Sequence, residues 1–117
     1  MNIADLFKND ANEQLDPRQS VVIYFNYGEK SLEKLHELES KLRIVLYNEG
    51  AGELEGHQMA LDLLDGFLYL YGDSAEALFK AIRPTLLATP FMKNAEIRLR
   101  FKKLENDDVS EIEFILE

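Results

Sequence analysis

The stretch Asp65–Glu76 (DGFLYLYGDSAE) decides the fold, because it contains the clearest strand, turn and helix start in the chain. Within it, Phe67–Tyr71 is apolar at both odd and even positions, which predicts a central strand covered on both faces. The Asp-Gly pair before that strand is typical of a hairpin turn, so a partner strand is expected upstream. After the strand, Asp73 and Glu76 have the spacing of a capping box, which predicts a helix with Asp73 as its N-cap.

Working outward from this stretch, similar patterns predict further elements. Leucines at three- and four-residue steps predict a helix that Gly50 ends. Upstream of Asp65, the inward face of a strand switches near Gly56, which a bulge or a turn would explain. Pro84 kinks or ends the second helix. The further elements are a strand over 20–27, a helix over 31–47, a strand within 51–64, a strand over 95–103 and a strand over 109–116.

The order of these elements is β-α-β-β-α-β with one additional strand at the end. This order favours a ferredoxin-like α+β fold, in which an antiparallel sheet carries both helices on one face. The extra C-terminal strand is expected to form a hairpin with the fourth strand. We expect a single domain over residues 20–117, preceded by an arm or short helix over residues 1–19.

Basic residues alternate with apolar ones along the fourth strand. A turn centred between residues 106 and 107 would pair Lys102 with Glu111 across the outer face of the sheet, and Arg100 with Glu113. This predicts a ladder of surface ion pairs rather than an anion-binding site, and each pair contributes little to stability. The basic residues in this region are Lys93, Arg98, Arg100, Lys102 and Lys103.

The bulk composition excludes several classes of protein. The chain has 117 residues, a formal net charge of -9 and no Cys, which excludes disulfides, cysteine zinc sites and thiol nucleophiles. No apolar run approaches the roughly 20 residues that span a bilayer, so no membrane association is expected. Residues 1–15 lack the basic and apolar regions of a signal peptide. We therefore expect a cytoplasmic protein of bacterial type that needs no cofactor.

The two central strands are rich in aromatic residues. Residues 23–26 and 66–71 resemble the two stacking motifs of the RNA-recognition fold. However, Asp65 stands where that motif has a basic residue, Leu68 stands where it has a small one, and the negative charge would repel phosphate. Nucleic acid is therefore not the expected partner. A contact with a second copy or with another protein is the favoured role for this sheet face, through Tyr24, Phe67, Tyr69 and Tyr71.

A weak metal-ligand pattern lies in the segment before the hairpin. Glu53, Glu55 and His57 occupy alternate positions of a strand, and divalent ions accept carboxylate and imidazole ligands together. A charged, solvated edge strand produces the same spacing, and this is the favoured interpretation.

The sequence offers no arrangement of catalytic residues. A hydrolase needs a nucleophile beside a base, or two placed carboxylates. His36 borders the leucine stripe of the first helix, and Ser31 and Ser74 stand where helix caps belong. The protein is therefore not expected to be an enzyme.

Residues 52–57 (GELEGH) and 65–75 (DGFLYLYGDSA) also have a family-like pattern. They resemble a group of small stand-alone bacterial proteins of uncharacterised function, with the pattern G-E-x-[DE]-G-[HN] followed by D-G-x-L-Y-x-Y-G-x-D-A. The resemblance extends over about residues 52–101 and implies no catalytic residues. Small acidic αβ proteins of this kind include immunity proteins to secreted toxins, an analogy of size, charge and fold.

Negative charge is concentrated in the middle of the chain, since no Lys or Arg occurs between Arg43 and Lys80. Such a surface favours a basic protein partner. The lead hypothesis is a non-enzymatic interaction module, in its sharpest form an immunity-type inhibitor of a basic toxin or nuclease, because carboxylates can mimic phosphate and steer association. The alternatives are a metal- or small-ligand-binding regulatory domain and a self-associating domain. The candidate partner-binding residues are Glu49, Glu53, Glu55, Asp62, Asp65 and Asp73.

Overall fold

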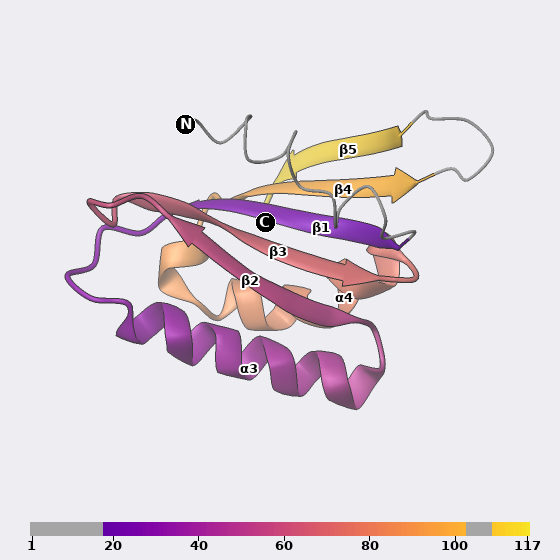
Figure 1. Cartoon of the computed structure of the whole chain (residues 1–117), viewed down its shortest axis with the longest axis horizontal. Coiled ribbons are helices and arrows are strands. Elements are labelled where there is room, and N and C mark those ends of the chain that lie inside the picture. The colour runs from indigo at the N-terminus through magenta and orange to yellow at the C-terminus, as the bar shows by residue number, and fades with distance from the viewer. Residues whose placement is uncertain (1–17, 103–108) are drawn as a thin grey trace.

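A five-stranded antiparallel sheet forms one layer of the molecule, and two helices pack against one face of it (Figure 1). This computed structural model describes residues 18–102 and 109–117. The strand order is β2-β3-β1-β4-β5, so β2 and β5 are the edges. The elements are β1 (Gln19–Asn26), α3 (Glu33–Glu49), β2 (Glu53–Met59), β3 (Asp65–Gly72), α4 (Ala75–Leu87), a 3₁₀ turn η1 (Pro90–Met92), β4 (Glu96–Lys102) and β5 (Val109–Ile115).

The hydrophobic core lies between the sheet and the helices. The expectation that β1 and β3 are covered on both faces is confirmed in large part, since both strands are interior and mostly buried. Alternate residues of each strand face the helices, where the removal of apolar surface from water stabilises the fold. The side chains buried there include Ile23, Phe25, Leu35, Leu42, Leu46, Leu68, Leu70, Leu78, Ile82 and Ile97.

The helix ends confirm one sequence prediction, correct a second and narrow a third. Gly50 ends α3 in the left-handed conformation, with φ of 62°. The N-cap of α4 is Ser74 rather than Asp73, because the Ser74 hydroxyl accepts the backbone N–H of Ala77 at 3.1 Å. Of the two predicted effects of Pro84, a kink or an end of the helix, the end is excluded, because Pro84 lies inside α4 and the helix continues to Leu87.

The β2–β3 turn is not at the Asp-Gly pair, so that prediction is wrong. Asp65 and Gly66 both belong to β3, and the connection lies between Met59 and Asp65. There the N–H of Leu63, at φ of 60°, donates to the Ala60 carbonyl at 3.0 Å. Gly66 serves close packing instead, because a Cβ at this position would lie 2.2 Å from the Met59 sulfur.

The β4–β5 hairpin is confirmed, but its expected register is wrong by two residues. Arg100 lies opposite Glu111 rather than Glu113, and Arg98 lies opposite Glu113. A shift of two keeps every side chain on its face, so alternation alone could not detect it. The expected turn residues lie outside the described part of the chain.

The inward face of β5 is only partly covered. Leu116, just beyond the strand, is buried and Phe114 is half-buried, whereas Ile112 is 53% exposed. Since β5 is an edge strand, it has a neighbouring strand on one side only.

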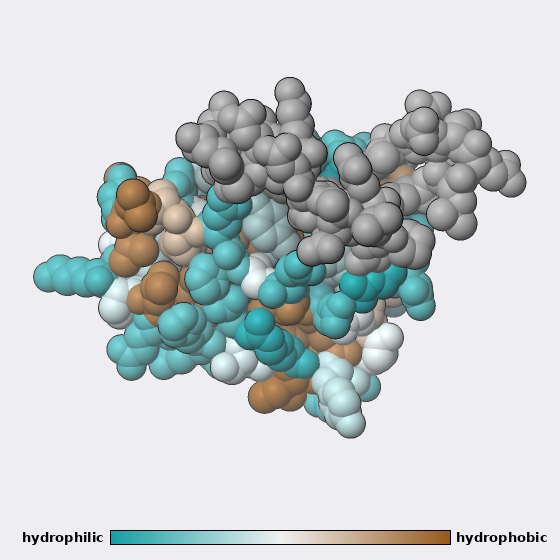
Figure 2. Space-filling model, in the orientation of Figure 1, coloured by the Kyte–Doolittle hydropathy of each residue, from teal (hydrophilic) through white to brown (hydrophobic). Residues whose placement is uncertain are grey.

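The surface seen in Figure 2 is mostly hydrophilic, with hydrophobic residues in small separate groups. Two exposed leucines, Leu61 and Leu64, lie in the β2–β3 connection. No helix within residues 18–102 and 109–117 is long and apolar enough to cross a membrane. Of the expected N-terminal arm, residues 1–17 lie outside the described part, and Gln19 already belongs to β1.

Candidate functional site

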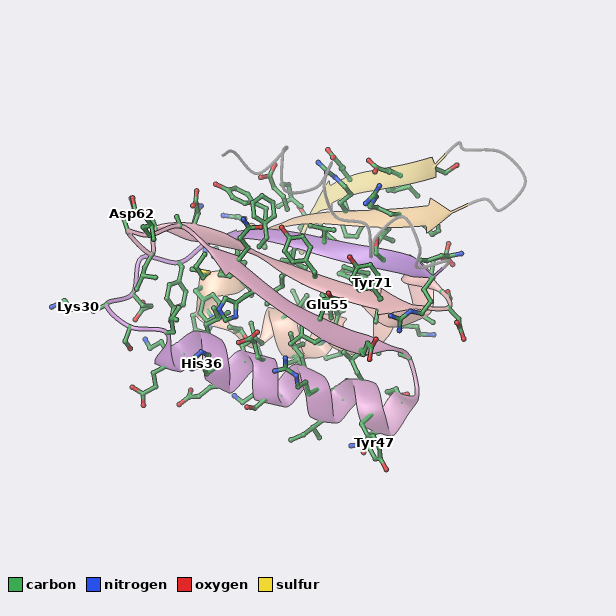
Figure 3. The ribbon with its side chains drawn as sticks, viewed as in Figure 1. Lys30, His36, Tyr47, Glu55, Asp62 and Tyr71 are labelled. Carbon is green, nitrogen blue, oxygen red and sulfur yellow. The ribbon has the colours of Figure 1, made fainter. Side chains whose placement is uncertain are left out.

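The six candidate partner-binding acids fall into two groups at opposite ends of the β2–β3 hairpin. Asp62 lies in the turn and Asp65 is the first residue of β3, whereas Asp73 follows the far end of β3, a strand about 23 Å long. Figure 3 shows Asp62 at the turn and Glu55 in the middle of β2. We call the second group, Glu49, Glu53, Glu55 and Asp73, the acidic end.

Two glycines bring the segments of the acidic end together. The backbone before β2 runs so close to the end of β3 that a Cβ on Gly52 would lie 2.2 Å from the Tyr71 carbonyl oxygen. A Cβ on Gly72 would lie 2.3 Å from the Ala51 carbonyl oxygen. Glycine is therefore required at both positions, and it places the residues around Gly52 beside Asp73.

Several of the acids have structural roles. Asp65 accepts a hydrogen bond from the Tyr24 hydroxyl at 2.5 Å, and Asp62 accepts the backbone N–H of Leu64 at 3.1 Å. Glu53 forms an ion pair with Arg18 at 2.8 Å. The hydrogen bond to Asp65 raises the pKa of Tyr24, and burial and the charges of Asp65 and Glu96 raise it further.

The remaining acids of the acidic end form no ion pair with the described part of the chain. Glu49, Glu55 and Asp73 are exposed, and within the described residues none of the three forms an ion pair. The basic residues of β4, by contrast, face acids of β5: Arg98 pairs with Glu113, and Arg100 with Glu111 at 2.9 Å. Apart from Glu53, which pairs with Arg18, the acids of the acidic end are thus not neutralised by the described part of the fold.

The expected group Glu53, Glu55 and His57 does not come together, because β2 contains a bulge. Leu54 lies opposite Leu70, but Gly56 lies opposite Tyr69, so Glu55 is an extra residue in the strand. After the bulge, His57 lies opposite Leu68, which faces the helices, whereas Glu53 lies opposite Tyr71 on the other face. The switch of face that the sequence predicts near Gly56 is confirmed, and it separates His57 from the two glutamates.

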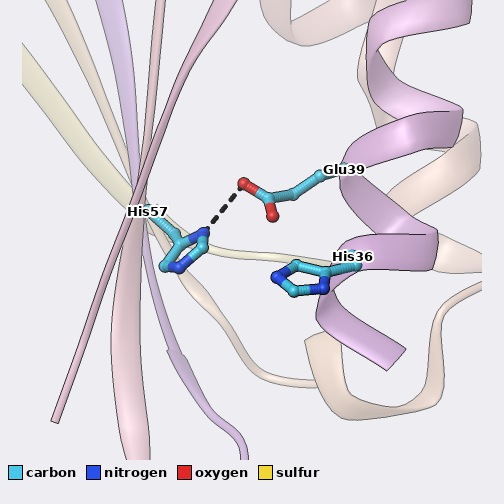
Figure 4. A group of neighbouring side chains, drawn as sticks. All are labelled: His36, Glu39 and His57. Carbon is cyan, nitrogen blue, oxygen red and sulfur yellow. Dashed lines mark hydrogen bonds and ion pairs between the residues drawn. The ribbon is translucent and has the colours of Figure 1, made fainter. Parts of the chain in front are cut away.

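The bulge instead brings His57 to two residues of α3. His57 Nδ1 donates to Glu39 Oε2 at 3.0 Å, and the ring centroids of His36 and His57 lie 6.1 Å apart. One ligand atom from each of the three residues lies within 4.8 Å of the other two. Figure 4 shows His36 and Glu39 reaching from α3 toward His57 on β2. We call this group the His–Glu cluster.

The cluster has a buried acid at its centre. Glu39 is only 5% exposed, whereas His36 is exposed and the His57 side chain is 28% exposed. A buried carboxylate is stable only with compensating partners, and His57 is such a partner for Glu39. The cluster therefore presents two imidazoles and one carboxylate, ligands suited to a divalent transition metal ion.

The four aromatic residues expected at a contact do share the face of the sheet opposite the helices. Tyr24 lies across from Phe67 with ring centroids 5.0 Å apart, and Phe67 stacks on Tyr69 at 6.1 Å. Tyr71 on this face is buried. A hollow of about 460 Å³ lies beside the pair, lined also by Arg98, Glu113 and Ile115.

The sequence did not lead us to Glu39 as a functional residue, and His36 was interpreted only as a residue that borders the leucine stripe of its helix. Their spacing of three residues places them on one side of a helix, and this could have been read from the sequence. Their approach to His57 depends on the bulge and on packing of α3 beside β2, which no local pattern indicates.

Comparisons with protein-family models, with curated proteins and with solved structures find no match to this chain. The resemblance of residues 52–101 to small bacterial proteins therefore stays a prediction.

Proposed function

We propose that the protein is a non-enzymatic interaction module that binds a basic protein partner through its acidic end. The observation that carries this proposal is the unequal pairing of charge. Arginines of β4 are matched by glutamates of β5, while Glu49, Glu55 and Asp73 have no cation among the described residues. Unmatched exposed carboxylates steer a basic partner and raise its rate of association.

An exposed aromatic residue on the last turn of α3, the turn that also carries Glu49, supports the same surface. Tyr47 is 86% exposed near the end of α3, two residues before Glu49, and Figure 3 shows it directed away from the sheet. Ile44, 61% exposed, lies one turn earlier on the same helix. Tyrosine is enriched among the residues that dominate binding energy, and charged groups around it provide specificity. The proposed surface therefore combines an apolar anchor with a negative rim.

An immunity-type inhibitor of a basic nuclease or toxin is the sharpest form of this proposal. A nuclease presents cationic groups where it binds phosphate, and carboxylates can occupy those groups in place of the substrate. A cytoplasmic location belongs to the same proposal, since an inhibitor of this class protects the cell that makes it.

The test compares two charge reversals of equal size. The double variant Glu49→Lys with Glu55→Lys changes the acidic end, and Glu33→Lys with Glu37→Lys makes the same change at the other end of α3. The wild type and both variants would be immobilised, exposed to lysate of the encoding organism, and the captured basic protein identified and titrated. We expect the first variant to lose at least tenfold in affinity and the second to lose little. Equal affinities for the two variants would remove the acidic end from the proposal.

Self-association through the sheet face is a second candidate, favoured by the hollow beside Tyr24 and Phe67. Sedimentation of the wild type and of Phe67→Glu would test it. A dimer that the substitution dissociates would support this candidate, and a monomer at high concentration would remove it.

We also propose that the fold is ferredoxin-like. In support, β1 and β3 are adjacent and antiparallel, and β2 and β4 flank them. Each helix then connects two strands that have one antiparallel strand between them. In this proposal β5 is an addition beside β4.

A further inference from the structure

We propose that His36, Glu39 and His57 bind a divalent transition metal ion, with Zn²⁺ as the best match. The site is separate from the acidic end and goes beyond the proposed interaction function. One ligand atom from each residue already lies within 4.8 Å of the others. Both histidines of the chain belong to this cluster, although 21 positions separate them (57 minus 36).

Each ligand is placed by a distinct feature of the fold. His36 and Glu39 lie three residues apart on α3, so both side chains project from the same side of the helix. His57 faces α3 only because Glu55 is an extra residue in β2. Without that bulge, the register of Leu54 with Leu70 would continue, and His57 would lie opposite Phe67 on the far face of the sheet.

The burial of Glu39 is an independent observation that favours a cation here. A carboxylate that is 5% exposed has lost most of its hydration, and the His57 imidazole contacts it at 3.0 Å. A metal ion would neutralise the carboxylate and would use both imidazoles at once. Without a metal ion, the same contact is a structural His57–Glu39 pair, which is the alternative that the test must distinguish.

The donor set selects the class of ion. Two imidazole nitrogens and one carboxylate oxygen are borderline donors that suit Zn²⁺, Ni²⁺ or Co²⁺, whereas Mg²⁺ and Ca²⁺ prefer oxygen ligands alone. Zinc bonds of about 2.1 Å require ligand atoms roughly 3.3 Å apart. The His57–Glu39 contact is already near this separation, and the exposed His36 side chain can rotate to close the rest. Three protein ligands would leave one position for water or for a ligand from another molecule.

Calorimetry on the full chain without an affinity tag would test the site, with ZnCl₂ as the probe and MgCl₂ as the hard-cation control. We expect one Zn²⁺ per chain and no response to Mg²⁺. His36→Gln, Glu39→Gln and His57→Gln should each weaken Zn²⁺ binding at least tenfold. Glu37→Gln is the matched control, because it removes a carboxylate next to His36 and outside the cluster, and it should leave the affinity unchanged.

Imidazole NMR gives a second measurement that does not depend on the stability of any variant. With two histidines in the chain, both sets of ring resonances should shift on addition of one equivalent of Zn²⁺. The proposal would be overturned by an absence of Zn²⁺ binding in the wild type. It would equally be overturned by affinities that the three cluster substitutions leave unchanged, or by a Zn²⁺ titration that moves neither ring.

Discussion

The two edges of the sheet differ in how their charged side chains are paired. On β4 and β5, arginines and glutamates alternate on the same face and meet across the strands, as in the Arg98–Glu113 pair. Along α3 and β2, Glu49 and Glu55 remain without cations among the described residues, and Glu39 is buried against His57. Charges that are matched within the fold contribute to structure, whereas those left unmatched are available to ligands. Function is therefore expected on the α3–β2 side.

The largest expected effect comes from breaking the close approach that forms the acidic end. In Gly52→Ala, the new methyl group would lie 2.2 Å from the Tyr71 carbonyl oxygen, at a backbone φ of 150° that side chains rarely adopt. We expect a loss of about 3 kcal/mol or more in the free energy of unfolding, measured in urea.

Gly28→Ala is the matched control for this substitution. Gly28 also has a positive φ, of 72°, but a Cβ there would meet no atom within 4 Å. It should cost only the backbone strain, about 1 kcal/mol. Equal losses in the two variants would show that the packing at Gly52 does not support the acidic end.

The next largest effect on stability is expected from Zn²⁺, a ligand that would bind on the α3–β2 side alone. If Zn²⁺ binds the His–Glu cluster in the folded state only, free Zn²⁺ at about a hundred times Kd should stabilise the protein by about 2.7 kcal/mol. His36→Gln, which should weaken Zn²⁺ binding at least tenfold, should reduce this gain to about 1.4 kcal/mol or less. The stability without metal should stay nearly unchanged, because His36 is exposed. Thermal unfolding of both proteins with and without Zn²⁺ would measure it, and equal gains would place the ion elsewhere.

Local pattern was sufficient to predict the elements and most of the sheet faces. Apolar residues at both parities predicted β1 and β3, and the face switch near Gly56 predicted the bulge. The β2–β3 turn was mispredicted because Leu63 adopts a positive φ without being Gly or Asn. Asp65 and Gly66 have a turn-like sequence, but each is used in β3 for a contact with another strand, one with Tyr24 and one with Met59.

Only some residues of the candidate site could be predicted from the sequence. His57 and the charge of β2 were evident from the sequence, but Glu53 and Glu55, its weak candidate co-ligands, do not group with it. A bulge moves every later side chain of the strand to the opposite face of the sheet. A prediction whose register is wrong by one residue therefore assigns the wrong neighbours to all of these side chains. The contact between Glu39 and His57 joins residues 18 apart, and it depends on how α3 packs beside an edge strand.

A smaller effect concerns the hydrogen bond between Tyr24 and Asp65, which joins β1 to the hairpin. Because Asp65 raises the pKa of Tyr24, the folded state holds this proton at a pH where the unfolded chain, with an ordinary value near 10, releases it. The stabilisation is present below pH 10 and is lost as the pH rises through the folded-state value. We expect Tyr24→Phe to cost about 1 kcal/mol at neutral pH, and the cost to shrink in alkaline solution.

Tyr47→Phe is the control for this prediction. It removes the same oxygen from a side chain that is 86% exposed and has no hydrogen bond among the described residues. Its stability should follow that of the wild type across the pH range in urea unfolding. A Tyr24→Phe cost that stays constant above pH 10 would contradict the assigned cause.

The smallest expected effect lies in the matched ladder of β4 and β5. The Arg98 and Glu113 side chains are 46% and 61% exposed, so their attraction is weakened by water and by salt. A double-mutant cycle with Arg98→Ala and Glu113→Ala should give a coupling energy of about 0.5 kcal/mol that declines in about 1 M NaCl.

The same cycle on the buried pair of Glu39 and His57 should give a larger coupling energy that depends less on salt, since burial limits screening. A larger coupling energy in the exposed pair than in the buried pair would contradict the proposed difference between the β4–β5 edge, whose charges are paired, and the α3–β2 side, whose charges are available to ligands.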